Sequence, residues 1–221
     1  MAYTFNMIAP AAGFNIVSQG GTSYTADASG LISGINSGDV NSLEASGCLF
    51  AGNLTQPLSL TQFLVSSGQP LPSVASSGVL GLSCVPGTNI TLLGELASSN
   101  TKTDYAVTEF IMPPAYLAGS PFNIIINAQW TSSGSTSSAS VVPTIYKTPV
   151  TGQQVSSENL VLTSAKQVTS SAANYTFLVN GTPSSGAVVG GQRLLLQLTS
   201  TLTNTSGTNT MQINSVAYQI A

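Results

Sequence analysis

The side chains that could perform chemistry are few, and the carboxylates are the ones with a recognisable reaction to offer. The chain has seven of them, Asp27, Asp39, Glu44, Glu95, Asp104, Glu109 and Glu158, and it has no histidine. Two carboxyl groups about 5–10 Å apart in a cleft could hydrolyse a glycosidic bond, and Glu109 with Glu158 is the pair that two strands could bring together. Ion pairing of these acids with Lys102, Lys147, Lys166 or Arg193 is the simpler alternative.

The absence of histidine removes the commonest general base and every Ser-His or Cys-His nucleophile. Cys48 and Cys84 have neither metal-binding spacing nor a Cys-x-x-Cys motif, and buried free thiols are the simplest interpretation, with a disulfide as the alternative. No loop collects the oxygen ligands that calcium needs. We therefore expect no enzyme activity, no metal and no cofactor. Tyr116, Tyr146 and Tyr175 could instead line a ligand groove.

Strands are the elements that would position these residues. From Phe122 to Trp130 apolar residues alternate with a second set that is mostly amide, with Ile125 as the exception, which predicts one face in a core and one mainly polar, uncharged face. Eight such strands are predicted, at about 89–96, 103–112, 121–131, 138–148, 159–169, 173–180, 191–203 and 209–220. The apolar phase of the last strand changes at Asn214-Ser215, which predicts a β-bulge. The pattern indicates a mainly β fold, a jelly-roll β-sandwich.

Three smaller parts are expected before the sandwich. The predicted parts are an N-terminal arm over residues 1–18, a module over 19–50, an ordered connector over 51–88, and the jelly-roll domain over 89–221. The arm is apolar and uncharged, and a first edge strand is the alternative interpretation. The connector is rich in Pro, Gly and Ser, but it is too apolar for a free linker.

The module of residues 19–50 is predicted to be a small β-hairpin followed by a short helix. Residues 22–27 and 31–35 would form the hairpin, Asp39 would cap the helix N-terminus, and Gly47 would end it in a left-handed conformation. Gly21-Thr22-Ser23-Tyr24-Thr25-Ala26-Asp27, followed by Asp39-Val40-x-x-Leu43-x-x-x-Gly47-Cys48, resembles a small module of tailed-bacteriophage virion proteins. The resemblance implies a structural addition without catalytic residues.

The second half of the chain is similar to the jelly-roll cement, or decoration, proteins of tailed phages. The shared features are Phe110-x-Met112-Pro113-x-x-Tyr116, a Ser-rich loop at 132–140, Gly190-Gly191-x-Arg193-Leu194, Asn204 with Asn209, and Val216-x-Tyr218. The sequence departs from that pattern at Gln192, where an Asp is usual. The resemblance implies a protein on the capsid surface that binds the major capsid protein over or between capsomers.

The composition of the chain excludes two classes of partner. Charged residues are 5% of the sequence, against about 25% in a typical soluble domain, and the net charge is −3. Four scattered basic residues cannot follow a phosphate backbone, so no nucleic acid is expected. No apolar stretch approaches the roughly 20 residues of a membrane span, and no basic region precedes the apolar N-terminus as in a secretory signal. A chain this neutral has little charge repulsion to keep its copies apart.

The sequence thus favours a capsid cement protein that stabilises a phage head. The alternative is a receptor-binding head, or a tail fibre or spike tip, that recognises a host surface glycan or protein. We expect a homotrimer, because a shell presents local three-fold positions. The residues expected at protein interfaces are Tyr3, Phe5, Met7, Ile8 and Phe14 in the arm, and Ile125 and Leu195 in the sandwich.

Overall fold

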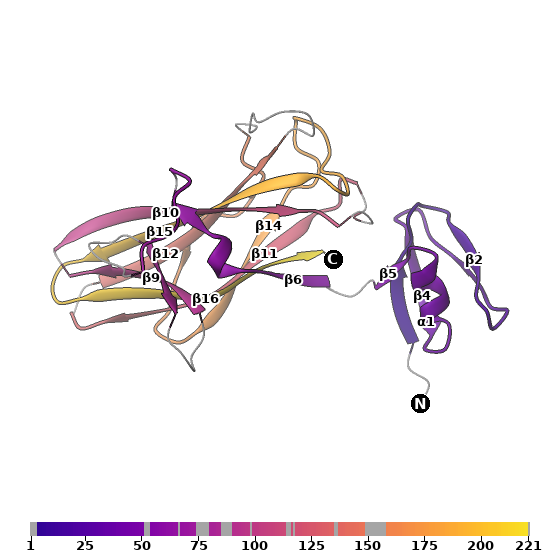
Figure 1. The fold of residues 1–221 in the computed structure, drawn as a ribbon, viewed down its shortest axis with the longest axis horizontal. Coiled ribbons are helices and arrows are strands. Elements are labelled where there is room, and N and C mark those ends of the chain that lie inside the picture. Colours follow the sequence, from indigo (N-terminus) through magenta and orange to yellow (C-terminus); the bar gives the residue numbers. More distant parts are fainter. Residues whose placement is uncertain are drawn as a thin grey trace.

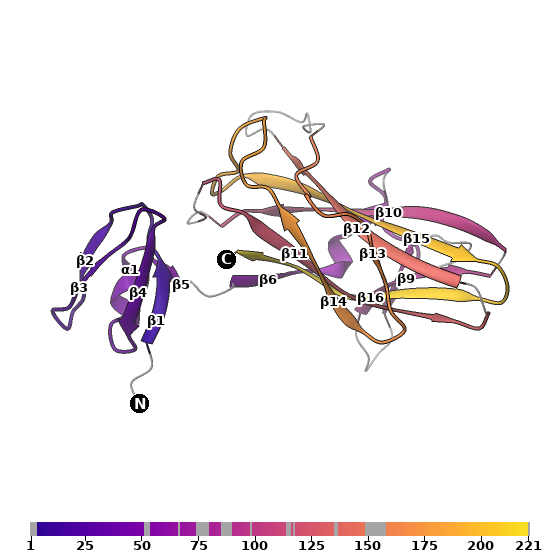
Figure 2. The same cartoon turned by 180° about the vertical axis from the view of Figure 1, so that it is seen from behind.

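A computed structural model describes residues 4–50, 54–65, 67–73, 80–84, 90–97, 99–113, 116, 118–134, 137–148 and 158–220. Two separate hydrophobic cores divide the chain. The smaller core belongs to an N-terminal module of residues 4–50, and the larger one lies between the sheets of residues 54–220 (Figure 1). The two sheets of the larger part face each other as a sandwich, which Figure 2 shows from behind. The predicted mainly β sandwich is confirmed.

The N-terminal module combines short strands with one helix. Its elements are β1 (Thr4–Ile8), β2 (Asn15–Val17), β3 (Ser23–Thr25), β4 (Leu31–Asn36), α1 (Val40–Ala45) and β5 (Leu49–Phe50). One sheet has the order β4-β1-β5, and β2 with β3 forms a separate two-stranded ribbon. The module core is built from Met7, Tyr24, Ile32, Ile35, Leu43 and Cys48, all buried.

The segment predicted as an arm is part of this module. β1 is the central strand of the three-stranded sheet. Met7 is fully buried, Ile8 is half-buried, and Phe14 packs against the same core. Tyr3 and the side chain of Phe5 lie outside the described residues. The described residues of the segment therefore belong to the fold of the module, through β1 and β2, and do not form a separate arm.

The predicted hairpin over 22–27 and 31–35 does not form, although its turn does. The Asp27 carboxylate accepts hydrogen bonds from the N–H groups of Ser29 and Leu31, which fixes the turn between β3 and β4. Beyond that turn, β3 pairs with β2, and β4 pairs with β1. The strands of the first 18 residues supply partners that the sequence pattern could not reveal.

Helix α1 begins and ends where the sequence predicts, but Asp39 acts differently from the expected cap. Asp39 occupies the N-cap position without a side-chain capping hydrogen bond, and its Oδ2 accepts the hydroxyl of buried Tyr24 at 2.7 Å. Gly47 has a φ of 85°, and the N–H of Cys48 reaches the carbonyl of Leu43 at 2.9 Å. These are the features of a Schellman C-terminal motif.

The sandwich contains two sheets. Its elements are β6 (Leu54–Leu58), the 3-10 helix η1 (Leu60–Gln62), β7 (Leu64–Val65), β8 (Leu80–Cys84), β9 (Ile90–Leu96), β10 (Asn100–Ile111), β11 (Phe122–Ser132), β12 (Ser137–Lys147), β13 (Lys166–Gln167), β14 (Ala173–Val179), β15 (Arg193–Asn204) and β16 (Asn209–Ile220). The five-stranded sheet has the order β13-β12-β15-β10-β7. The six-stranded sheet has the order β14-β11-β16-β9-β8, with β6 also paired to β16.

The strand pairs are nested, as in a jelly roll. β9 pairs with β16, β10 with β15, β11 with β14, and β12 with β13, all antiparallel. The chain from β9 to β16 is therefore one long hairpin wrapped around a core, with its strand pairs placed alternately in the two sheets. Phe110 of β10 stacks on Tyr218 of β16 across that core, with ring centroids 4.8 Å apart.

The predicted bulge in the last strand is confirmed. Asn127 of β11 pairs with Ser215, and Ala128 pairs with Ile213, so Asn214 is the extra residue on β16. The bulge resets the two-residue period of the strand. Met211 and Ile213 before it, and Val216 and Tyr218 after it, all face the core.

Two predicted segments differ in detail from the structure. Described parts of the connector 51–88 belong to the sandwich: β6 and β8 join the six-stranded sheet, β7 joins the five-stranded sheet, and Phe63 is buried in the core.

The strand predicted over 159–169 is reduced to β13 and one isolated bridge at Val161. Leu160 donates its N–H to Ile145 of β12 and accepts that of Asn180, so this segment links the two sheets at their edge.

A loop at residues 183–187 is held by two opposite charges. The Glu158 carboxylate accepts the N–H groups of Ser184 and Ser185 at 2.9 and 3.0 Å. Lys147 Nζ donates to the carbonyls of Ser185, Gly186 and Ala187, the shortest at 2.6 Å. The hydrogen bonds from Ser184 and Ser185, led by the Ser184 N–H, lower the pKa of Glu158 below its ordinary value of 4.5.

The hydrogen bond between Tyr24 and Asp39 should stabilise the module alone. Tyr24→Phe removes a hydroxyl that donates to Asp39 and accepts the N–H of Asn36, so buried polar groups lose their partner. We expect the melting temperature of the module to fall by several degrees while the sandwich transition stays fixed, as followed by calorimetry and by NMR signals of residues 4–50. Tyr105→Phe, on the exposed face of the sandwich, is the matched control. An unchanged module transition would contradict this role.

The hydrogen bonds between Glu158 and the loop at residues 183–187 should weaken in acid. A carboxyl with a lowered folded-state pKa contributes stability above its ordinary pKa, and that stability is lost as the pH falls through the lower folded value. We expect the amide signals of Ser184 and Ser185 to hold steady near neutral pH and to shift only below about pH 4.5. Glu158→Gln should abolish this acid transition. A transition that persists in that variant would assign it to another group.

Candidate binding groove

The outer face of the five-stranded sheet carries a regular array of mixed side chains. Three successive rows across β10, β15 and β12 are Tyr105, Thr199 and Val142; Val107, Gln197 and Thr144; and Glu109, Leu195 and Tyr146. The residues between them in each strand, such as Ala106, Leu196 and Ile145, are buried in the core. Apolar and hydrogen-bonding groups therefore alternate over a platform on the order of 10 by 14 Å, from the spacing and rise of strands.

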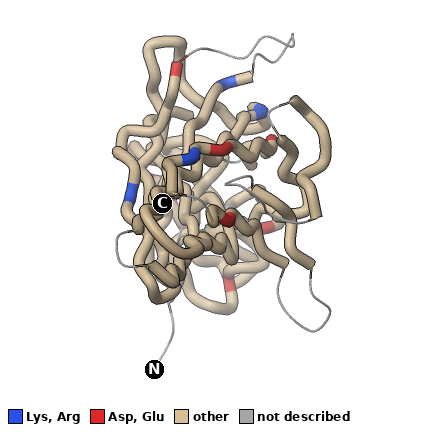
Figure 3. Tube along the Cα trace, turned by 90° about the vertical axis from the view of Figure 1, so that its left-hand side faces the viewer, with Lys and Arg blue, Asp and Glu red and all other residues tan. Residues whose placement is uncertain are grey.

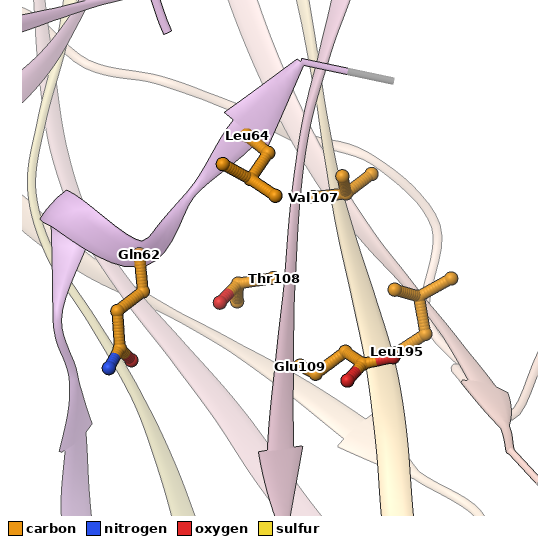
Figure 4. Close-up of a pocket in the computed structure, with 6 residues that line it drawn as sticks. All are labelled: Gln62, Leu64, Val107, Thr108, Glu109 and Leu195. Atoms are coloured by element: carbon orange, nitrogen blue, oxygen red, sulfur yellow. The ribbon is translucent and has the colours of Figure 1, made fainter. Parts of the chain in front are cut away.

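A strap from the connector turns one side of this platform into a groove. The strap consists of η1 and β7, and β7 pairs with β10 through Leu64 opposite Val107. The groove encloses about 400 Å³ and is lined by Gln62, Leu64, Val107, Thr108, Glu109 and Leu195. Figure 4 shows that Gln62 and Leu64 come from the strap, the next three residues from β10, and Leu195 from β15.

The groove joins an apolar floor to a polar rim. Leu64, Val107 and Leu195 are half-buried and supply the floor. Glu109 forms an ion pair with Arg193, 3.4 Å between Oε2 and Nη1, and both side chains are about half exposed. A carboxylate accepts hydrogen bonds, a guanidinium has five N–H donors, and the amide of exposed Gln62 does both. This small set of polar groups around an apolar surface is typical of ligand sites.

The three tyrosines predicted to line a groove do not share one in the structure. Tyr146 lies on the platform beside Leu195. Tyr116 is buried in the core, where it meets Phe122 edge-on, and burial raises its pKa. Tyr175 packs against the core and its hydroxyl accepts the N–H of Thr169. Tyr105, which is 40% exposed on the platform, takes their place.

The two acids considered for glycoside hydrolysis have different settings. Glu109 lines the groove and pairs with Arg193, one of the partners that the sequence offered. Glu158 is not among the groove residues, and its carboxylate holds the loop at residues 184–185. Asp104 accepts the N–H of Leu80 and helps to hold β8.

The interface residues predicted in the sandwich lie on opposite faces. Leu195 points outward from the five-stranded sheet into the groove, and Ile125 points outward from the six-stranded sheet. Both are half-buried, as their phase in the strands predicts. The sequence could assign each residue to an outer face, but the pairing of strands decides which sheet each belongs to.

The part of the chain that the structure describes has few other groups that could perform chemistry. No group of three or more His, Cys, Asp or Glu side chains there could hold a metal ion. Cys48 is buried and free, and Cys84 is free and exposed, which corrects the expectation that both are buried. No described helix is both long enough and apolar enough to cross a membrane.

Comparison with known proteins gives only distant likenesses. No family model matches the chain, and no curated protein matches it. Among solved structures, carbohydrate-binding modules of a β-sandwich superfamily match 99% of this chain and 85% of theirs, at 13% identity and a TM-score of 0.42. The enzymatically active domain of tailspike protein 4 of bacteriophage CBA120 matches 73% of this chain at 10% identity and a TM-score of 0.39, and the match spans 20% of that chain. A module solved with β-1,4-galactotriose, TmCBM61, matches 77% of this chain and 88% of its own at 8% identity and a TM-score of 0.32. Likeness at this level supports no argument about function.

Proposed function

We propose that this protein is a virion-associated binding protein whose sandwich recognises a neutral carbohydrate on a host surface. The observation that carries the proposal is the groove on the five-stranded sheet, with its apolar floor and its rim of Gln62 and the Glu109–Arg193 pair. The receptor-binding alternative is therefore preferred to the cement role as the main function.

The chemistry of the groove suits a sugar chain. A sugar ring has hydroxyl groups at its edge, which need both donors and acceptors, and C–H groups on its faces, which pack on apolar surface. Glu109, Arg193 and Gln62 offer both kinds of hydrogen-bonding group, while Leu195 and Val107 offer aliphatic surface. Hydrogen bonds to charged groups are the stronger ones, and a carboxylate already oriented by a guanidinium loses little freedom on binding.

The platform extends the groove for a longer ligand. Tyr105 and Tyr146 lie at diagonal corners of the three rows, and each presents an apolar ring with a polar tip. Beyond them the next two rows bear only hydroxyls, with Thr103 bonded to Thr201 and Thr101 bonded to Thr203. An elongated, hydroxylated chain could lie along this surface without meeting a further charge on these strands.

The proposal is one of binding without catalysis. Glycoside hydrolysis by the common mechanisms uses two carboxyl groups on either side of the scissile bond. Among the described residues that line the groove, Glu109 is the one acid, and it is paired with Arg193. Stacking and hydrogen bonding, rather than a reaction, are what this set of side chains supports.

The virion association in the proposal rests on the N-terminal module. Several residues that carry its resemblance to phage virion modules have structural roles: Tyr24 bonds Asp39, Leu43 is in the core, Gly47 has positive φ, and Cys48 is buried. A compact unit with its own core, joined to the sandwich through residues 51–53, suits attachment to a particle. The sandwich would then be the part that is presented to the host.

The cement role remains a second candidate, because one face of the sandwich is almost free of charge. Copy number separates the two roles. A receptor-binding protein should be present in a few to a few dozen copies per particle, and a cement protein in hundreds. Quantitative gel densitometry of purified particles gives this number, and hundreds of copies would favour the cement role.

Carbohydrate binding should depend on the groove. We expect an oligosaccharide identified on a glycan array to bind the wild-type protein. Glu109→Gln should weaken that binding about tenfold or more, since hydrogen bonds to charged groups contribute about 1.5–3 kcal/mol. Leu195→Lys should weaken it to a similar extent, because it replaces apolar floor by a charge. Isothermal titration calorimetry or NMR titration measures the effect. Glu44→Gln, an exposed acid of α1, is the matched control and should bind normally. Silence across a broad array, or binding that both groove variants leave intact, would refute the proposal.

A further inference from the structure

Charge is distributed very unevenly between the two sheets. All four basic residues of the chain lie in strands of the five-stranded sheet: Lys102 in β10, Lys147 in β12, Lys166 in β13 and Arg193 in β15. The strands of the six-stranded sheet contain a single charged residue, Glu95 of β9. Figure 3 shows how few charged positions mark the trace as a whole.

The outer face of the six-stranded sheet is instead covered by amides. Its rows across β14, β11, β16 and β6 or β9 are Leu178, Asn123, Gln219 and Thr55; Thr176, Ile125, Ala217 and Pro57; Asn174, Asn127 and Ser215; and Gln129, Gln212 and Leu93. Asn127 Nδ2 donates to Asn174 at 2.8 Å, Asn214 Nδ2 donates to Asn127 at 2.9 Å, and Gln129 Nε2 donates to Gln212 at 3.1 Å. The bulge thus adds Asn214 as a third amide to the hydrogen-bonded pair of Asn127 and Asn174.

An apolar stripe crosses the middle of this amide face. Ile125 lies between Thr176 of β14 and Ala217 of β16, and Pro57 of β6 follows in the same row; Ala217 is buried, so Ile125 and Pro57 are the apolar residues of this row that reach the surface. Leu178, in the next row, is 41% exposed. An apolar centre without charge, surrounded by polar groups, is the composition of the buried part of a protein interface.

We propose that this face, named here the amide face, is where two copies of the chain meet. Two identical surfaces repel each other when they carry like charges, and the amide face carries none except Glu95 at its edge. Each side-chain amide has both hydrogen-bond donors and an acceptor. Amide groups that are not used in the hydrogen bonds within one face can therefore bond to those of an identical face. Burying amides that find partners avoids the desolvation cost of burying ions.

The size of the amide face is sufficient for a specific contact. Four strands about 4.8 Å apart, over eight residues with a rise of about 3.4 Å each, give a surface on the order of 500 Å² per subunit. Two subunits would therefore bury about 1,000 Å², which is near the lower limit for a specific interface. Amides already bonded to each other are held in place before association, so less side-chain freedom is lost.

This inference lies beyond the carbohydrate-binding proposal, because it concerns the opposite face of the sandwich. It retains Ile125 from the predicted self-contact and assigns Leu195 to the groove instead. It also leaves the groove exposed to ligand in the assembled protein. A contact between two identical faces is two-fold and closes a dimer, so this inference gives a dimer in place of the homotrimer expected from the sequence.

The test measures the mass of the full chain by light scattering and analytical ultracentrifugation at micromolar concentration. We expect twice the 22.5 kDa of a single chain, and a trimer would contradict a contact between identical faces. Ile125→Lys should raise the dissociation constant at least tenfold and release the 22.5 kDa monomer. Leu195→Lys, the same change at a half-buried position in the other sheet, is the matched control and should keep the wild-type mass.

Two checks keep the outcomes distinct. Thermal unfolding establishes that each variant is folded, and Leu178→Lys, at an exposed position, repeats the test should Ile125→Lys fail to fold. A wild-type monomer would overturn the inference, and a shell protein would then be the remaining candidate partner for the amide face. An Ile125→Lys variant with unchanged mass, or equal dissociation by Leu195→Lys, would overturn it as well. Carbohydrate binding by the monomeric Ile125→Lys variant would show that the two proposals stand or fall separately.

Discussion

The structure depends on the two-residue period of a few long strands. In β11 and β15 every second side chain enters one shared core, and its neighbours are forced onto an outer face. The nested pairing of β9 to β16 then fixes which strands are neighbours, and so which outward residues form a surface together. A slip of one residue would exchange the buried and exposed sets, so Ile124 and Leu196, fully buried, hold the register for both surfaces.

The same constraint explains why one chain can have two dissimilar faces. A sandwich shares its interior but has two exteriors, and the residues on them are free to differ. On the five-stranded sheet the strap of η1 and β7 adds a wall, and charges and tyrosines accompany it. On the six-stranded sheet β6 continues the line of β9 along β16, which extends the outer face of that sheet. The connector is therefore the part of the chain that distinguishes the two faces.

Much of the sandwich could be predicted from the sequence, because alternation is a local property. Seven of the eight predicted strands agree closely with observed ones, and the phase change at Asn214 was sufficient to locate the bulge. Pairing between distant segments was not predictable in this way. The place of β1 inside the module and of β7 beside β10 depends on contacts between segments far apart in sequence. The groove shows the same limit. The sequence marked Glu109 as a possible acid or ion-pair partner and Leu195 as an interface residue, but Gln62 and Leu64 gave no local signal. Tyr116 fails as a groove residue because its ring is needed in the core.

The confinement of the basic residues to one sheet has a consequence for how the protein responds to salt. The Glu109–Arg193 pair is half exposed, so added electrolyte would screen it and weaken any contact made through it. The face built from Asn127, Gln129 and Ile125 offers almost nothing to screen, and strongly hydrated anions such as sulfate would favour its burial. Ionic strength would therefore act in opposite directions on the two sides of a single sandwich less than two hundred residues long.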